Sequence, residues 1–241
     1  MRISELLSKK ARNINGEKSV TIAFLGDSVT QGCFEIFSLP NGGIDTVYEP
    51  TSSFSARLRE ILAILYPSAQ VNIINSGISG DSAKGGLARL ERDVLRFSPD
   101  LTVVSYGLND CSGGMATIPE YLSNLGKIFD RLAECGSEII FLTQNFYNTG
   151  ISPHLKEEKE LEIAKTFAAL QSEGVLKAAF DGAKKLCAEK KIKVCDLYSV
   201  WEKLHYGGVN TTELLSNKIN HPAREMHYYM AMKLAETMLD I

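Results

Sequence analysis

Residues 21–32 join a buried strand to a reactive side chain, and this short stretch narrows the choice of fold at once. Its sequence, TIAFLGDSVTQG, begins with five apolar or β-branched residues and then changes to a glycine, a carboxylate and a hydroxyl. An apolar run that ends at Gly26 in this way is typical of a strand buried on both faces and followed by a tight turn. Such strands belong to parallel sheets covered by helices, in which ligands bind at the carboxyl ends of the strands. We therefore expect Ser28 to lie at a binding site, as a candidate nucleophile.

Four further apolar segments alternate with segments of helical periodicity. The predicted strands are residues 71–75, 101–106, 138–143 and 193–198. The predicted helices lie near residues 1–16, 54–66, 87–95, 119–132, 156–191 and 226–238. Strands that alternate with helices form parallel sheets with right-handed crossovers, and a length of 241 residues suits one α/β domain. The sequence therefore predicts a single domain over residues 1–241, a three-layer α/β/α sandwich around a five-stranded parallel sheet.

Composition excludes several classes of protein and partner. Hydrophobic residues make up 44% of the chain and charged residues 23%, as in ordinary globular proteins. A net charge of −3 gives no reason to expect nucleic acid as a partner, because phosphate binding depends on clustered Lys and Arg. No run of about 18 apolar residues predicts a membrane span, and without an apolar leader we expect a cytoplasmic protein. The sequence carries no signal of oligomeric state.

The chain has no pattern that predicts a cofactor or a metal. Its five cysteines are widely spaced and form no C-x-x-C pair, which indicates reduced thiols. They are Cys33, Cys111, Cys135, Cys187 and Cys195. No two histidines have metal-ligand spacing on one helix, and no glycine-rich nucleotide motif follows a strand. We therefore expect neither a bound metal nor a cofactor.

Polar residues also follow the second and third predicted strands. Gly80-Asp81-Ser82 repeats the tripeptide around Ser28, but a turn with a helix cap would explain it equally well. We prefer Ser28 as the nucleophile because its strand is more uniformly apolar. After the third strand, Asn109 either closes a turn with its own backbone or donates its amide hydrogen to an oxyanion.

A serine nucleophile requires a base, and the chain has four histidines. His221 has the best context, because the following Pro222 fixes the backbone at the entrance of the last helix. His205 and His227 are expected to be ordinary surface residues. His154 falls in a second long segment without periodicity, residues 144–157, that is predicted to be a lid.

The segment after the nucleophile, residues 32–53, also lacks clean periodicity and is predicted to be a long loop. Loops of this length are often functional. It forms either one wall of the substrate site or a solvated insertion, and the sequence favours neither. Together with residues 145–157, its mixture of Phe, Tyr, Asn and Gly suits short acyl groups on a polar carrier such as a carbohydrate.

Taken together, four blocks resemble the SGNH hydrolases, also called GDSL-type esterases and lipases. The blocks are Gly26-Asp27-Ser28, Ser79-Gly80-Asp81, Gly107-Leu108-Asn109-Asp110 and His221-Pro222. They follow one another between residues 20 and 240, each where strand periodicity ends, and residues 78–90 are similar to the thioesterase and lysophospholipase branch. The resemblance implies the flavodoxin-like fold of these hydrolases and a small-molecule acyl ester as the substrate.

The resemblance also implies a role for each site residue. Ser28 attacks the acyl carbonyl, and His221 serves as general base and then as general acid. The oxyanion is bound by the backbone N–H of Ser28, the backbone N–H of Gly80 and the side-chain amide of Asn109. Lysophospholipase, thioesterase or acyltransferase activity at the same site is an alternative, as is a ligand-binding module with impaired catalysis.

One residue departs from the family pattern. The family usually has Asp three residues before the histidine, where this chain has Lys218. A lysine cannot orient the imidazole as a carboxylate does, so we expect Lys218 to point outward. Either a backbone carbonyl holds the ring of His221 in a Ser-His dyad, or another acid such as Glu213 replaces the missing Asp; we favour the dyad.

Overall fold

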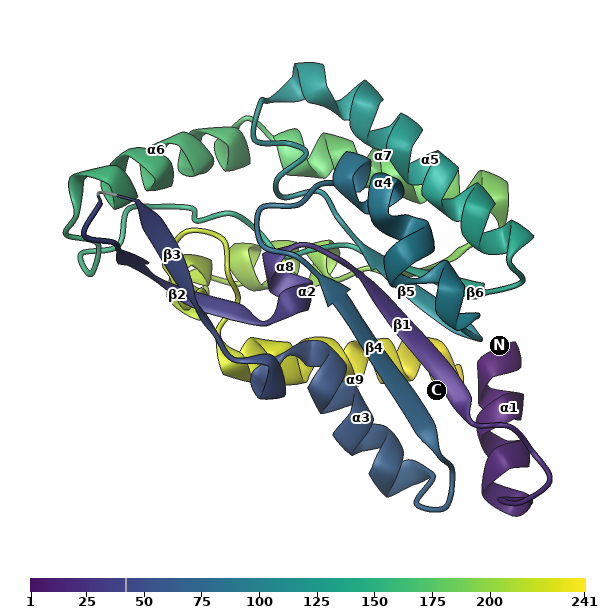
Figure 1. Cartoon of the computed structure of the whole chain (residues 1–241). Coiled ribbons are helices and arrows are strands. Elements are labelled where there is room, and N and C mark those ends of the chain that lie inside the picture. The colour runs from purple at the N-terminus through teal and green to yellow at the C-terminus, as the bar shows by residue number, and fades with distance from the viewer. Residues whose placement is uncertain (42) are drawn as a thin grey trace.

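The protein was analysed as a computed structural model, which describes residues 1–41 and 43–241; Gly42, in the predicted loop 32–53, lies outside this description. The central sheet has five parallel strands, β1 (Val20–Gly26), β4 (Val71–Gly77), β5 (Leu101–Ser105), β6 (Glu138–Leu142) and β7 (Lys193–Cys195). Their order is β4-β1-β5-β6-β7, and Figure 1 labels the first four of them. This order is that of doubly wound, flavodoxin-like sheets, and it confirms the predicted fold class.

Helices cover both faces of the sheet. On one face α1 (Arg2–Arg12), α3 (Phe54–Leu65) and α9 (Arg224–Leu239) pack together, and on the other α4 (Ala83–Asp93), α5 (Ile118–Glu134) and α7 (Val175–Lys190) do so (Figure 1). The remaining helices are α2 (Ser28–Gln31), α6 (Glu158–Ser172) and α8 (Tyr198–Tyr206). None of the helices in the described part of the chain combines the length and the apolar character needed to cross a membrane.

Burial explains why the first strand reads so clearly in the sequence. All residues of β1 are buried except Thr21, because β1 pairs with β4 on one side and β5 on the other. By contrast, β4 lies at the edge of the sheet and none of its residues is fully buried. The carboxyl end of β1 therefore lies between two other strand ends, which is where the sequence predicts the site.

The segment predicted as a loop over residues 32–53 is in fact mostly a hairpin. Strands β2 (Cys33–Ser38) and β3 (Ile44–Tyr48) pair antiparallel, with a shift of register between Cys33 and Ile36. The strands are only partly buried, so their side chains have no continuous apolar alternation. The prediction of a loop was wrong because a two-stranded ribbon with a bulge does not show the period of two that marks a half-buried sheet.

The first part of the second long segment, residues 144–148, keeps an irregular conformation but lies in the core and does not form a lid. Residues 144–148 are all buried. The Asn148 side chain donates to the carbonyl oxygen of Ala164 at 2.9 Å, and the Tyr147 ring stacks on Phe167 with 4.5 Å between centroids. Residues 144–148 therefore pack against α6 as part of the core.

Candidate active site

Ser28 stands at the turn between β1 and α2. A Cβ atom at Gly26 would overlap the carbonyl oxygen of Ser105, so the turn requires a glycine. Asp27 then caps the helix, its Oδ1 accepting from the N–H of Val29 at 3.0 Å. Ser28 is the first residue of α2 and only 5% exposed. The short sequence GDS thus ends the strand, starts the helix and fixes the direction of the hydroxyl.

His221 reaches Ser28 from 193 residues further along the chain. Its Nε2 lies 2.9 Å from Ser28 Oγ, and its Nδ1 lies 2.8 Å from the carbonyl oxygen of Phe34 in β2. Because a carbonyl oxygen can only accept, Nδ1 carries the hydrogen and Nε2 is free to accept the hydroxyl proton. The ring is thus held in the tautomer that a general base requires.

The loop that carries His221 is organised by Asn217, a residue that the sequence analysis did not single out. Asn217 Oδ1 accepts from three backbone N–H groups, those of Ile219 at 3.0 Å, Asn220 at 2.9 Å and His221 at 2.9 Å. Asn is common in such turns, but its contact with three successive N–H groups depends on the folded loop. Asn217 therefore fixes the backbone from which the imidazole projects.

Burial sets the protonation of the groups around the hydroxyl. It lowers the pKa of His221 to about 4, and the hydrogen bond to Phe34 and the charge of Glu35 oppose the shift. Burial also raises the pKa of Asp27 to about 7, against hydrogen bonds from Gln144 and the backbone. Gln144 Nε2 donates to Asp27 Oδ2 at 2.8 Å, a contact that the sequence gave no signal for. At neutral pH the imidazole is therefore uncharged and able to take a proton.

The residue in place of the family's Asp points away from the imidazole. Lys218 has a φ of +59° and its Nζ lies 3.0 Å from Glu213 Oε2. Glu213 also accepts from Ser152 Oγ at 3.0 Å. Both nitrogens of His221 are occupied, one by Ser28 and one by the Phe34 carbonyl. In this arrangement the backbone carbonyl, and not Glu213, orients the ring.

The predicted oxyanion donors lie in the same pocket as Ser28. Gly80 has a φ of +76°, a conformation that glycine adopts without strain, and its surroundings are open. Asn109 Nδ2 donates one hydrogen to the carbonyl oxygen of Asp81 at 2.8 Å, which fixes the amide beside the Gly80 turn. Ser28, Gly80, Asn109 and His221 all line one pocket of about 320 Å³. The structure thus brings together the four residues that the sequence singles out.

The walls of this pocket combine apolar and polar side chains, and the hairpin and the His221 loop supply both kinds. The apolar residues come from the hairpin, from α6 and from the His221 loop: Ile36, Ile44, Ile163, Phe167 and Ile219. The polar ones are Thr46, Ser79, Asn217 and Asn220, besides the four site residues. Of the two alternatives for residues 32–53, the structure favours the wall, because three residues of the hairpin line the pocket of Ser28. Within the described chain, residues 145–157 do not line the pocket, and α6 takes the place predicted for them.

A buried network supports the Gly80 turn from behind. The Asp81 carboxylate lies 2.7 Å from the guanidinium of Arg89 and accepts from the Tyr106 hydroxyl at 3.1 Å. Arg89 also donates to the carbonyl oxygens of Gly26 at 3.0 Å and Ser76 at 2.6 Å. It thereby ties the ends of β1 and β4 to the turn. The sequence did not reveal this, because an arginine in an amphipathic helix looks like a surface residue.

The other histidines lie elsewhere. His227 was predicted to be a surface residue, but it is fully buried and its Nδ1 accepts from the N–H of Phe54 at 3.1 Å. Burial lowers its pKa to about 3. The prediction was wrong because His227 lies on the inner face of α9, where a weak amphipathic pattern hides the buried side. His154 and His205 are exposed, and neither lines the pocket of Ser28.

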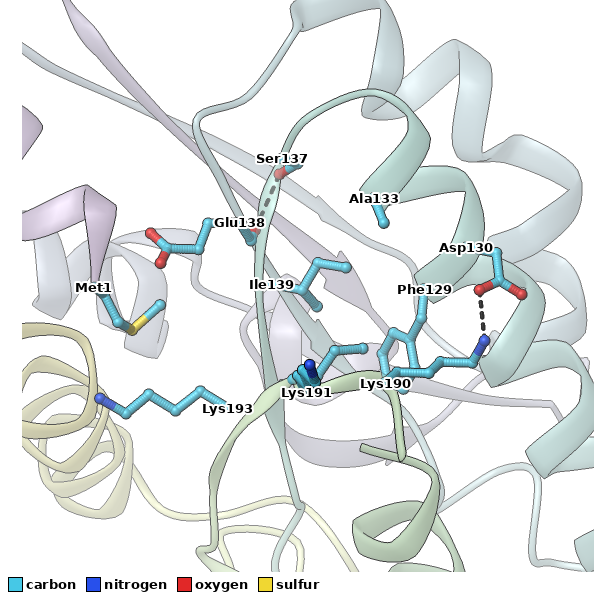
Figure 2. A pocket seen from close by; sticks show the side chains of 11 residues that line it. Met1, Phe129, Asp130, Ala133, Ser137, Glu138, Ile139, Lys190, Lys191 and Lys193 are labelled. Carbon is cyan, nitrogen blue, oxygen red and sulfur yellow. Dashed lines mark hydrogen bonds and ion pairs between the residues drawn. The ribbon is translucent and has the colours of Figure 1, made fainter. Parts of the chain in front are cut away.

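A larger cavity of about 660 Å³ lies at the other end of the sheet (Figure 2). Glu138 and Lys193, which begin β6 and β7, line it, so it is at the amino edge and away from Ser28. Two of its three lysines have acidic partners: Lys190 pairs with Asp130 and Lys193 with Asp240. It contains none of the predicted site residues. The smaller pocket, which contains the predicted nucleophile and base, is therefore the candidate active site.

Comparison with known proteins agrees with the resemblance found in the sequence. The model of the GDSL-like lipase/acylhydrolase family matches residues 24–228. An arylesterase of Vibrio mimicus is 29% identical over 119 residues, which cover 44% of this chain and 57% of that protein. An acetylxylan esterase of Geobacillus stearothermophilus is 30% identical over 96 residues, 40% of this chain and 41% of that protein. The chain thus matches about half the length of these curated relatives.

Solved structures share the fold at low sequence identity. A two-domain esterase active on acetylated mannans has a TM-score of 0.69 at 16% identity, covering 98% of this chain and 52% of that one. An acetylxylan esterase from Geobacillus stearothermophilus has a TM-score of 0.65 at 18% identity, covering 91% of this chain and 94% of that one. At these identities the likeness extends to the fold alone.

Proposed function

Because the chain belongs to the GDSL-like lipase/acylhydrolase family, we propose that it is a serine esterase that hydrolyses short acyl esters through an acyl-enzyme. The observation that carries the proposal is the 2.9 Å contact between His221 Nε2 and Ser28 Oγ, with Nδ1 bound to a carbonyl oxygen. A nucleophile within hydrogen-bond reach of an oriented base is the arrangement on which acyl transfer depends. The partner of the protein is then a small-molecule ester.

In the proposed mechanism Ser28 Oγ attacks the acyl carbonyl while His221 Nε2 takes its proton. The N–H groups of Ser28 and Gly80 and the amide of Asn109 bind the resulting oxyanion. The imidazolium then protonates the departing alcohol, and a water molecule, activated by the same ring, releases the acid from Ser28. The Phe34 carbonyl keeps the ring oriented throughout, so that the site works as a Ser-His dyad.

For the substrate we propose an acetyl or other short acyl group on a carbohydrate or a similar polar carrier. The pocket offers apolar side chains beside polar ones such as Thr46, Asn217 and Asn220, which suits an acyl methyl group next to a hydroxyl-rich alcohol. Two of the similar proteins act on acetylated xylan and mannan by their names. The five apolar side chains in the walls favour a second candidate, a lysophospholipase or thioesterase with a longer acyl chain.

Labelling and kinetics test the proposal. We expect a fluorophosphonate probe to label Ser28, and Ser28→Ala to lose both labelling and hydrolysis of p-nitrophenyl acetate. A series of p-nitrophenyl esters from acetyl to octanoyl, followed by acetylated xylo- and manno-oligosaccharides, separates the two candidate substrates. Turnover by Ser28→Ala equal to that of the parent would refute the mechanism, and a preference for octanoyl would favour the second candidate.

A further inference from the structure

Arg224 connects the helix after His221 to the hairpin that supplies the carbonyl for its ring. Arg224 is the first residue of α9, three residues after His221. Its Nη1 and Nη2 bind the two carboxylate oxygens of Glu35 at 2.6 and 3.0 Å. Its Nε binds Glu49 at 2.6 Å. A single guanidinium thus binds both arms of the hairpin at its open end, because Glu35 lies near the start of β2 and Glu49 directly follows β3.

Phe34, which precedes Glu35 in β2, contacts both Arg224 and His221. Its buried ring lies under the guanidinium of Arg224, 4.3 Å from ring centroid to Cζ, and its carbonyl oxygen accepts from His221 Nδ1 at 2.8 Å. His221 and the hairpin are therefore connected twice. The imidazole binds the Phe34 carbonyl, and Arg224, three residues after His221, binds Glu35, the residue after Phe34. Planar guanidinium groups make such bidentate and stacked contacts, which a lysine cannot reproduce.

We propose that Arg224 is a positioning residue for the general base, and that Glu35 supplies the negative charge near His221 that the family takes from an Asp. The inference rests on the proposed function, since it concerns the base of that mechanism. A carbonyl oxygen orients an imidazole only where the backbone that carries it is fixed. Arg224 fixes that backbone, and Glu35 stabilises the imidazolium that forms when Ser28 attacks.

The exposure of these side chains favours a role in positioning over one in stability. Those of Arg224, Glu35 and Glu49 are 33%, 43% and 37% exposed. Ion pairs this accessible to water contribute little to folding. A displaced catalytic group, by contrast, lowers the rate steeply, by about 100-fold for a shift of about 1 Å. Loss of Arg224 should therefore affect turnover far more than unfolding.

The charges around His221 determine how activity should depend on pH. Glu35 follows Phe34 in β2, and its charge raises the pKa of His221; Arg224 and His227 on α9 are the cationic or titratable groups nearby. Hydrogen bonds from Arg224 hold the pKa of Glu35 below its ordinary value and so favour its charged form. Removal of the charge of Glu35 should therefore move the acidic limb of the activity profile to lower pH.

Substitution of the arginine tests the positioning role. We expect Arg224→Met to lower kcat by about 10- to 100-fold with KM nearly unchanged, and Arg224→Lys to recover part of the loss. Arg131→Met is the matched control, because Arg131 forms an exposed ion pair with Glu91 at 3.0 Å on α5 and α4; we expect its kcat to stay within about twofold of the parent. A kcat for Arg224→Met equal to that of the control would overturn the inference.

The carboxylates give a second test that does not depend on the folding of the arginine variant. Glu35→Gln keeps the shape but loses the charge, so the acidic limb of kcat/KM should move to lower pH. Glu49→Gln, at the other end of the same guanidinium, should leave the limb in place. If the acidic limb of kcat/KM lay at the same pH in the two variants, the role of Glu35 would be contradicted.

Labelling distinguishes failure of this inference from failure of the proposed function. If the parent neither hydrolyses esters nor reacts with fluorophosphonate at Ser28, the proposed function fails and the inference fails with it. If the parent is labelled and Arg224→Met is labelled at the same rate, the function stands and only the inference is overturned. Slower labelling of the variant at an unchanged probe affinity supports both.

Discussion

Replacement of Asn109 by alanine removes one of the three donors proposed for the oxyanion. The side-chain amide has two hydrogens, and one of them is bound by the carbonyl oxygen of Asp81 at 2.8 Å, which fixes the direction of the other. A preorganised donor of this kind contributes about 2.7–4 kcal/mol to the transition state. We therefore expect Asn109→Ala to lower kcat by about 100- to 1,000-fold and to change KM little, because the ground-state carbonyl carries less charge.

The same substitution has a separate and smaller cost for folding. One side-chain to backbone hydrogen bond is lost, which lowers the free energy of unfolding by about 1 kcal/mol. In a chain of this size that corresponds to a decrease in Tm of roughly 2–4 °C. Asn72→Ala is the matched control, since the exposed Asn72 amide donates to Thr21 Oγ1 at 3.2 Å near the start of β4, at the far edge of the sheet.

Steady-state kinetics with p-nitrophenyl acetate and thermal unfolding of both variants separate the two effects. We expect similar small decreases in Tm for the two alanine variants, and a large loss of kcat for Asn109→Ala alone. The reasoning is refuted if Asn109→Ala keeps the kcat of the Asn72 control, or if its whole effect is in KM.

Three further predictions concern the base His221, the carboxylate Glu213 and the glycine at the end of β4. His221 acts as a base only when uncharged and burial lowers its pKa to about 4, so kcat/KM should fall as the pH falls through about 4, and half-loss near 6.5 would contradict this. Glu213→Gln should leave kcat within about threefold of the parent, whereas a loss near ~1,000-fold would make Glu213 the missing acid. Gly77→Ala should lower the free energy of unfolding by roughly 1–3 kcal/mol in denaturant titrations, because its Cβ would overlap the backbone of Gln31; Gly150→Ala, with open space around it, should change it by less than ~0.5 kcal/mol.

The sequence predicted the sheet and most of the site because both depend on local patterns. The inner strands β1, β5 and β6 are mainly apolar, and the carboxyl ends of neighbouring parallel strands meet at one edge. The residues Ser28, Gly80 and Asn109, which lie within four positions of the ends of β1, β4 and β5, were therefore predictable as neighbours. His221 was found by a weaker signal, its loop position before a proline, together with the family resemblance.

The parts that could not be predicted depend on contacts between distant segments. The acceptor for His221 Nδ1 is a main-chain oxygen, which every residue possesses and no motif marks. The hairpin that carries it lacks a clear period, and the burial of His227 follows from how α9 meets α3. The partners of Arg224 lie 175 and 189 residues away, so their pairing is visible only once the chain has folded.

A peptide oxygen in the place of a carboxylate changes how the proposed active site would respond to acid and to mutation. A carboxylate in that place would itself become protonated in acid, whereas an amide carbonyl does not titrate in the working range, so the group that orients the imidazole keeps the same charge as protons accumulate. Substitution of the Phe34 side chain leaves its oxygen in the chain. Its contact with His221 is lost only when the backbone of β2 moves. A scan of single side-chain replacements would therefore not identify this oxygen as part of the site.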